Sequence, residues 1–260
     1  MKTIWIGLGL ACILTFTGCG GSEPEKKAEA PAASSSGGAA LTPDEANGAT
    51  ITGKVILDGA KPVVKALDMS ANPVCMRAHP TPQMSEEAII NPNGTVKYAF
   101  VWIKDGAGVT DKTWQVPTSA VSLDQNGCMY KPHVLGVMAG QNIDIKNSDQ
   151  TNHNIHPQPT TNQEWNESQP PGSQDKLQTF SRQEVLIPVH CNIHPWMKAY
   201  IGVVSHPFFA VTGDDGTYTI KGLPAGTYTL EVIHEKYKTV DVQVTVAPKD
   251  SKTVDLTYKS

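Results

Sequence analysis

The sequence has 260 residues, of which 39% are hydrophobic and 18% charged, a composition sufficient for one or two ordinary hydrophobic cores. The formal net charge of −4 and the lack of a basic block in the sequence argue against a nucleic-acid partner. The 22 glycines and 19 prolines, together with few helix-favouring runs, predict many turns and an all-β fold.

The first eighteen residues are typical of an export signal rather than of the folded protein. Lys2 supplies a positive charge, Ile4–Phe16 form an apolar stretch that is short for a membrane span, and Thr17-Gly18-Cys19 end it with small residues. This arrangement resembles a bacterial lipoprotein signal, which implies that residues 1–18 are removed and that Cys19 is lipidated. Gly20 after the cysteine then implies the outer membrane, if the host has one, so the expected location is the cell envelope, either periplasm-facing or in the outer membrane. An ordinary cleaved signal peptide or a membrane anchor is the alternative.

The rest of the chain divides into a polar segment and a region of short strands. Residues 19–48 are rich in Ala, Ser, Gly, Pro, Glu and Lys without apolar periodicity, so we expect a disordered tether. From residue 49 onward, strand patterns alternate with turn signals, and near the C-terminus apolar and polar residues alternate as in half-buried strands. The expected strands cover residues 51–57, 98–103, 209–212, 217–220 and 227–232.

Two separated regions have the strand and turn pattern of a single β-sandwich module. The C-terminal region reads AVTGDDGTYTIKGLPAGTYTLEV and continues with YKTVDVQVTV, and the earlier region contains ITGKVILDGAKP and AFVWIKDG. The C-terminal region resembles the second half of a carboxypeptidase regulatory-like (transthyretin-like) β-sandwich. The earlier region resembles the first half of the same module. The resemblance implies one sandwich divided between residues 49–108 and 205–260, with residues 109–204 inserted. Two independent domains in series are the alternative.

The segment between these halves concentrates metal-ligating residue types. One stretch reads GQNIDIKNSDQTNHNIH, a strand pattern that leads through a polar turn to His153 and His156. A second stretch reads EVLIPVHCNIHPWMKAYIGVV, which is a strand, a tight loop with Cys191, His194 and Met197, and a return strand. A thiolate, imidazoles and a thioether that converge from two loops are the ligands of a mononuclear copper site.

These two stretches resemble those of cupredoxins, whose fold is a Greek-key β-sandwich with copper at one end. His153 and Asn154 match the first histidine of the family and the Asn that follows it. Cys191, His194 and Met197 match the cysteine, histidine and methionine of the family's ligand loop, in that order. The resemblance implies one copper ion bound by His153, Cys191 and His194. Met197 would be a weak axial ligand. Asn154 would contact the ligands without binding the metal itself.

Two points about this ligand set stay open. The loop from His194 to Met197 is shorter than in blue copper proteins, so the axial position holds Met197 or no residue, and a trigonal site tolerates either. His156 is the alternative to His153. Three residues apart on an extended strand, their side chains face opposite sides, so only one of them can bind the metal unless the chain turns. A binuclear centre is not expected, because the loop has no second cysteine upstream.

The five cysteines agree with a metal site. Cys12 is removed with the signal and Cys19 carries the lipid, which leaves Cys75, Cys128 and Cys191 in an oxidising compartment. The odd count in an exported domain predicts a Cys75–Cys128 disulfide and leaves Cys191 free to bind copper. The alternative is that Cys191 is paired and that no metal binds.

These features predict a membrane-anchored copper protein that carries single electrons in the cell envelope. The resemblance also implies a redox partner protein that docks on Pro195 and Trp196, beside the loop histidine that the family places nearest the surface. Trp196 as a core residue is the alternative. We do not expect an enzyme, because an oxidase or nitrite reductase would need a second copper site. The alternative functions are periplasmic copper binding or delivery, and a surface binding module with a structural metal.

Overall fold

The structure of the protein, a computed structural model, describes residues 39–259. This part of the chain forms seventeen β-strands and one helix of six residues, which confirms the prediction of an all-β protein. Among these residues, no helix has the length and apolar character needed to cross a membrane. The expected signal sequence and the expected lipidation site, Cys19, lie outside the described residues.

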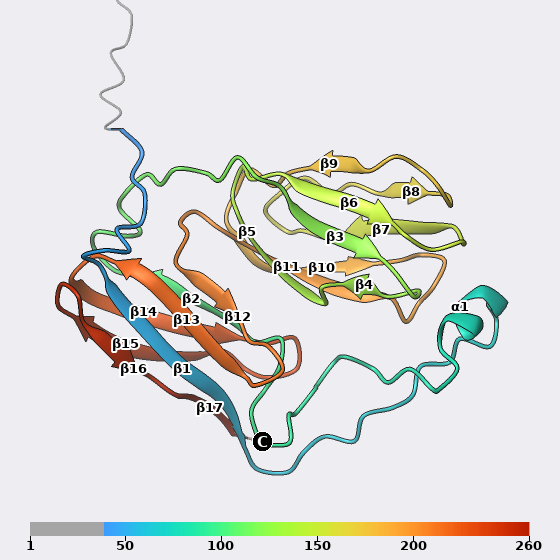
Figure 1. The fold of residues 1–260 in the computed structure, drawn as a ribbon, viewed down its shortest axis with the longest axis horizontal. Coiled ribbons are helices and arrows are strands. Elements are labelled where there is room, and N and C mark those ends of the chain that lie inside the picture. Colours follow the sequence, from blue (N-terminus) through green and yellow to red (C-terminus); the bar gives the residue numbers. More distant parts are fainter. Residues whose placement is uncertain (1–38, 260) are drawn as a thin grey trace, which may run out of the picture. The chain divides into compact units, whose positions relative to one another are not determined.

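One β-sandwich combines strands from the two ends of the described chain, and we call it the terminal sandwich (Figure 1). Its first sheet contains β1 (Ala49–Asp58), β13 (Thr217–Leu223), β16 (Ser251–Thr253) and β17 (Leu256–Lys259). Its second sheet contains β2 (Phe100–Asp105), β12 (Phe209–Val211), β14 (Gly226–Ile233) and β15 (Val240–Val246). β1 pairs antiparallel with β13, and β2 pairs antiparallel with β12 and β14. Strands from before and after the intervening segment therefore share both sheets.

The strands between these two groups form a second sandwich, which we call the inserted sandwich. One sheet contains β4 (Tyr130–Lys131), β3 (Val121–Gln125), β6 (Ile143–Asn147) and β9 (Lys176–Gln178), in that order. The other contains β5 (Val134–Met138), β11 (Lys198–Val204), β10 (Glu184–His190), β7 (His153–Pro157) and β8 (Glu167–Gln169), in that order. Its core is a separate apolar cluster that includes the fully buried side chains of Leu123, Ile145 and Ile155.

A third apolar cluster connects the two sandwiches through β2, β5 and β11. Phe100, which is fully buried, lies directly against the backbone of β11. A Cβ atom at Gly202 would lie 2.4 Å from the Phe100 ring, so only glycine permits this approach.

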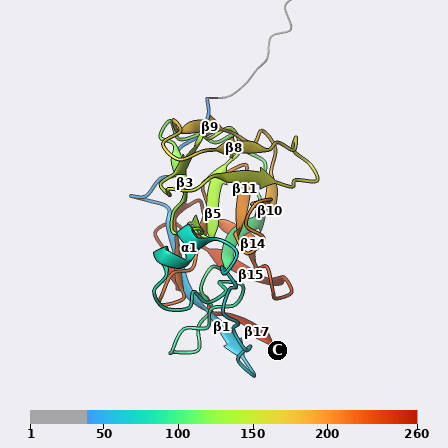
Figure 2. The same cartoon turned by 90° about the vertical axis from the view of Figure 1, so that its right-hand side faces the viewer.

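Between β1 and β2 the chain makes a long excursion that contains α1 (Pro73–Ala78), seen from two directions in Figure 1 and Figure 2. Its outer part is closed by a hydrogen bond from the backbone N–H of Leu67 to the carbonyl of Gln83 at 2.8 Å. We call residues 67–83 the cap segment. Leu67 and Met69 pack against the core of the inserted sandwich, and Cys75 forms a disulfide with Cys128. The excursion thus belongs by its contacts to both sandwiches, although the sequence suggested only the terminal one.

Residues on either side of the expected boundaries at 49 and 109 also make contacts with the terminal sandwich. The backbone of Leu41 exchanges hydrogen bonds with Thr113 and Gln115, at 2.9 and 2.7 Å, so residues before position 49 also contact the described fold. Val109 and Trp114 are buried in the core of the terminal sandwich, and the first inserted strand begins only at residue 121. β2 begins at residue 100 because Tyr98, with a φ of 64°, is in the left-handed region that strands do not use.

Candidate metal centre

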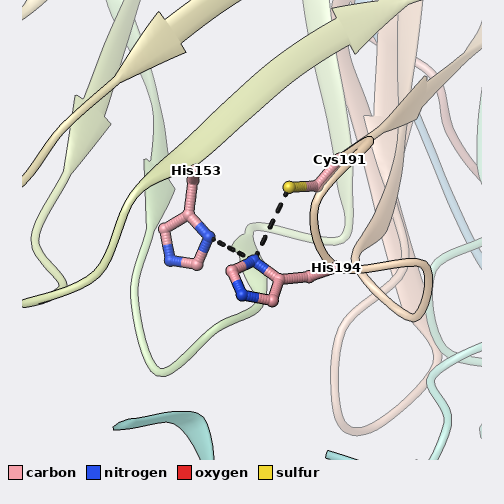
Figure 3. Close-up of side chains that lie close together, drawn as sticks. All are labelled: His153, Cys191 and His194. Carbon is pink, nitrogen blue, oxygen red and sulfur yellow. Dashed lines mark hydrogen bonds between the residues drawn. The ribbon is translucent and has the colours of Figure 1, made fainter. Parts of the chain in front are cut away.

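Three of the expected ligands meet at one end of the inserted sandwich (Figure 3). His153 is the first residue of β7, whereas Cys191 and His194 lie in the loop between β10 and β11. β7 and β10 are antiparallel, with His156 opposite His190. In this register the residues before His156 lie opposite those after His190, which brings His153 to the loop.

The loop itself is held in a tight turn by its own backbone. The N–H of Cys191 donates to the carbonyl of Met197 at 3.2 Å, and the N–H of Met197 donates to the carbonyl of His194 at 2.9 Å. These bonds close the short Cys-x2-His-x2-Met spacing and turn the thiol and the imidazole toward the same side. The side chain of Met197 is fully buried in the same apolar cluster as Cys191.

The donor atoms of the three residues face one another. Nδ1 of His153 lies 2.9 Å from Nδ1 of His194, and Sγ of Cys191 lies 3.7 Å from the same His194 nitrogen. All three donor atoms lie within 4.8 Å of one another, and the side chains are 0 to 3% exposed. A buried thiol beside two imidazole nitrogens matches the His2Cys donor set of a copper ion. The residues present therefore fit such an ion.

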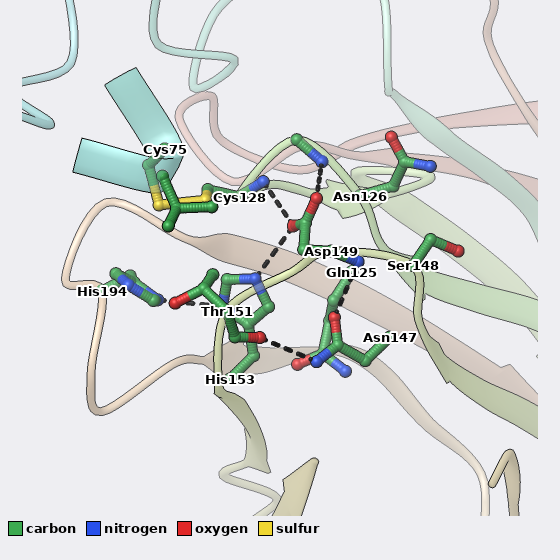
Figure 4. A network of polar contacts seen from close by, with 12 residues as sticks. Cys75, Gln125, Asn126, Cys128, Asn147, Ser148, Asp149, Thr151, His153 and His194 are labelled. Atoms are coloured by element: carbon green, nitrogen blue, oxygen red, sulfur yellow. Dashed lines mark hydrogen bonds and ion pairs between the residues drawn. A yellow bond between two sulfur atoms is a disulfide. The ribbon is translucent and has the colours of Figure 1, made fainter. Parts of the chain in front are cut away.

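Asp149 holds the His153 ring from the side opposite the candidate metal (Figure 4). Its Oδ2 accepts a hydrogen bond from Nε2 of His153 at 2.9 Å. The same carboxylate accepts the backbone N–H groups of Gly127 and Cys128, each at 2.7 Å. Burial raises the pKa of Asp149, but the hydrogen bonds from His153 and from these two N–H groups lower it more, so it lies below its ordinary value. A carboxylate behind a histidine is the usual support of a metal-bound imidazole.

The carboxylate in turn affects His153. Burial lowers the pKa of His153, whereas the hydrogen bond with Asp149 and the contact with Cys191 raise it more, and the net direction is upward. Cys128, Asp149 and His153 also form a compact group of possible ligand atoms. The sulfur of Cys128 is bonded to Cys75, so this second group lacks a free thiol.

Asn154 and backbone amides surround the sulfur of Cys191. Sγ of Cys191 donates to Oδ1 of Asn154 at 3.4 Å, and the same oxygen accepts the backbone N–H of Asn192 at 2.7 Å. Burial raises the pKa of the Cys191 thiol, while His153 and the backbone N–H groups of Asn154 and His194 lower it more. The net pKa is below the ordinary value, which favours the thiolate that metals bind.

His194 is covered by the cap segment and by Trp196. Nε2 of His194 lies 2.7 Å from Nδ2 of Asn72, the N-cap residue of α1. The ring of Trp196 lies beside it, with ring centroids 5.0 Å apart. Burial lowers the pKa of His194 to about 4, and the neighbouring His153 acts in the same direction. His194 is therefore neutral at pH 7.

The remaining expected site residues lie outside this group of donors. Among the described residues, His156 belongs to no compact ligand group. Its Nε2 lies 2.5 Å from Glu164, and its Nδ1 lies 3.2 Å from Asn192. Pro195 is exposed, whereas Trp196 is half-buried and donates its indole N–H to the carbonyl of Cys128 at 3.1 Å. Cys75 and Cys128 form the expected disulfide, and Cys191 is a free, buried thiol.

Two residues of the centre were not expected from the sequence. Asp149 stands four residues before His153 in a polar turn, and such an acidic residue near a metal-ligating histidine is a recognisable signal. Asn72 is followed by Pro73, which is the pattern of a helix N-terminus and predicts α1 but not its contact with His194. Asn72 and His194 are 122 residues apart in the chain, so no local sequence pattern predicts their contact.

Comparison with known proteins identifies one region by sequence. The family model of the carboxypeptidase regulatory-like domain matches residues 198–259, which run from β11 to the end of β17. No curated protein sequence matches the chain.

Several solved structures are similar to part of the chain. A Cu(I) form of an amicyanin mutant is 20% identical, with 40% of this chain and 97% of that chain covered and a TM-score of 0.29. A purple cupredoxin from Nitrosopumilus maritimus is 18% identical, with 32% and 98% covered and a TM-score of 0.28. A copper-containing nitrite reductase from Thermus scotoductus is 20% identical over 38% of this chain, with a TM-score of 0.31, and the chain spans 25% of its length. Likenesses at such TM-scores carry no weight for function. The comparisons thus show a match to the carboxypeptidase regulatory-like domain at residues 198–259.

Proposed function

We propose that this protein binds one copper ion through His153, Cys191 and His194 and carries single electrons in the cell envelope. The observation that supports the proposal is the buried group of one free thiol and one nitrogen from each of two imidazoles, with all three atoms within 4.8 Å of one another. A copper ion there would supply the one-electron redox chemistry. The chain's own residues bind and orient it, and they exclude water from its ligands.

The chemistry of the donors favours copper over other common metals. Zinc accepts cysteine and histidine, but structural zinc sites are closed by four such ligands and usually contain more thiolates. A single thiolate with two imidazoles, and a buried thioether in the same loop, suits copper in both oxidation states. Met197 is therefore proposed as the weak fourth ligand, since it is buried in the same cluster as Cys191.

The surroundings of the donors favour electron transfer over catalysis. The side chains of His153, Cys191 and His194 are at most 3% exposed. Each of them is held by a hydrogen bond to the side chain of another residue. A rigid, dry site changes little when the charge of the metal changes, which keeps the reorganisation energy low. We accordingly propose that the protein is not an enzyme and that it serves a redox partner protein.

The decisive experiment is an optical and paramagnetic-resonance spectrum of the Cu(II)-loaded soluble fragment. An intense visible charge-transfer band is expected, because the Cys191 thiolate is the most polarisable ligand. Cys191→Ser should abolish this band, whereas Met197→Leu should retain copper and shift the reduction potential. An unchanged spectrum in Cys191→Ser would exclude the proposed ligand set. Rapid loss of copper to a chelator, without a reversible redox wave, would instead support copper delivery.

The proposal includes attachment to the membrane through lipidated Cys19, motivated by the signal pattern that precedes it. Cys19→Ser should release the protein from the membrane fraction of expressing cells. Retention of the variant in that fraction would show that Ile4–Phe16 act as an anchor. Separation of inner and outer membranes would then test the proposed outer-membrane location.

A further inference from the structure

The side chain of Asn72 makes contacts in two directions at once. On one side its Oδ1 accepts the backbone N–H groups of Val74 and Cys75, at 3.0 and 3.2 Å, as the N-cap of α1. On the other side its Nδ2 lies 2.7 Å from Nε2 of His194. Because the oxygen is committed to two N–H donors, only the amide NH2 faces the histidine ring.

This orientation determines where the proton of His194 lies. An NH2 group can only donate, so Nε2 of His194 must accept and is unprotonated, which leaves Nδ1 as the nitrogen that carries the proton. That proton then points at Nδ1 of His153, 2.9 Å away. His153 accepts there and carries its own proton on Nε2, which it donates to Asp149. One chain of hydrogen bonds therefore runs from Asn72 through both histidines to Asp149.

The two candidate ligands are consequently held in opposite tautomers. Asp149 keeps the proton of His153 on Nε2, so its Nδ1 has a free lone pair and is ready for a metal. Asn72 keeps the proton of His194 on Nδ1, the atom that must lose it before it can bind a metal. The ring remains neutral in both cases, and only the position of its proton differs.

We propose that Asn72 is a positioning residue that holds His194 in its metal-free tautomer, so that metal binding at Nδ1 requires the Asn72 amide to leave the N-cap of α1. With the proton on Nε2, His194 needs an acceptor, and Oδ1 of Asn72 can serve only by releasing Val74 and Cys75. The Cys75–Cys128 disulfide keeps α1 beside the loop while the cap is exchanged. The proposal rests on the proposed copper site, and it makes the start of α1 respond to metal loading.

Two substitutions of Asn72 distinguish its role as the N-cap of α1 from its contact with His194. In Asn72→Asp, one carboxylate oxygen can cap α1 while the other accepts Nε2–H of His194, so the conflict disappears. In Asn72→Ser, the hydroxyl can still cap the helix but presents no NH2 group to the ring. Cu(I) affinity, measured by competition with a chromophoric chelator, should rise about tenfold in Asn72→Asp. It should rise less in Asn72→Ser, which gains no acceptor.

Two readouts do not depend on redox activity. Nitrogen-15 spectra of the metal-free protein at pH 8 should show His194 protonated at Nδ1 and His153 protonated at Nε2. Cu(I) loading should increase hydrogen exchange at the amides of Val74 and Cys75 in the wild type but not in Asn72→Asp.

Weaker Cu(I) binding in both variants would show that Asn72 assists loading and would overturn the proposal, as would an Nε2-protonated His194 in the metal-free protein. Failure of the proposed function is a different result. In that case copper would give no thiolate band in any variant, whereas the metal-free spectra would still decide whether Asn72 sets the His194 proton.

Discussion

The carboxylate of Asp149 accepts a hydrogen bond from Nε2 of His153 at 2.9 Å, on the side of the ring that faces away from Cys191 and His194. The same carboxylate is anchored by the N–H groups of Gly127 and Cys128, next to the disulfide. Asp149 therefore connects the candidate ligand His153 to the Cys75–Cys128 disulfide, which holds the cap segment. This relation leads to the first prediction.

Asp149→Asn should weaken Cu(I) binding by about 10- to 100-fold. The amide cannot accept from His153 and from both backbone N–H groups, because its NH2 group would face one of these donors. Affinity measured by chelator competition checks the prediction. Asp175→Asn, at an exposed carboxylate near Lys146, is the matched control and should bind as the wild type does. Equal affinity of both variants would contradict a supporting role for Asp149.

His153→Ala should abolish copper binding, whereas His156→Ala should leave it intact. His153 belongs to the compact donor group, whereas His156 is engaged by Glu164 and Asn192. The visible band of the Cu(II)-loaded fragment should disappear in His153→Ala and persist in His156→Ala. The reverse pattern would make His156 the ligand while leaving the copper proposal in place.

Replacing both Cys75 and Cys128 by serine should lower the free energy of unfolding by about 4 kcal/mol. The disulfide joins residues 53 positions apart, and closing a loop of that length restricts the unfolded chain by about this amount in the chain-entropy account. Urea denaturation of the metal-free protein measures the change, and Cys191→Ser, which keeps the disulfide, serves as the control. An unchanged midpoint and slope would show that the cap segment is held by its packing alone.

Stability in acid should depend on Glu184. Burial raises its pKa, but hydrogen bonds from Thr160 and Asn162 lower it more, to about 2 from an ordinary value of 4.5. A depressed folded-state pKa stabilises the fold above pH 4.5, and this contribution is lost as the pH falls toward 2. It should amount to only about 1 kcal/mol, because the carboxylate is partly exposed and solvent screens it.

Glu184→Gln should therefore be less stable than the wild type at pH 7, and the difference should shrink at pH 2 to 3. Urea denaturation at several pH values measures both quantities. Glu45→Gln, at an exposed position, controls for the general loss of one negative charge. A pH-independent difference between Glu184→Gln and the wild type would contradict the linkage.

The exposed part of the ligand loop should govern electron exchange with other molecules. Ile193 lies between Cys191 and His194 and is 46% exposed, and the neighbouring Pro195 is also exposed. Ile193→Gln should slow electron self-exchange between copies of the protein, measured by NMR line broadening in mixtures of the two redox states. Leu177→Gln, at a residue of β9 that is 62% exposed, should leave the rate unchanged. Equal rates in the two variants would place the contact elsewhere.

Local patterns in the sequence were sufficient to predict the fold class and most residues of the candidate site. The strand and turn pattern of residues 51–58 and the alternation of residues 227–232 predicted strands that the structure shows as β1 and β14, because a half-buried strand buries every second side chain. The spacing of Cys191, His194 and Met197 placed three potential ligands in one tight turn, since residues so close in the chain cannot separate. Copper itself, and the ligand set, stay predictions.

Only the tertiary structure determined that Asn72 contacts the candidate ligand His194. Asn72 and His194 are 122 residues apart, and no local pattern relates them. They meet because the Cys75–Cys128 disulfide and the packing of Leu67 and Met69 bring the cap segment onto the inserted sandwich. The proposed tautomer of His194 depends on this distant partner, whereas that of His153 depends on Asp149, four residues away, because a neutral imidazole places its proton where its neighbours can accept it.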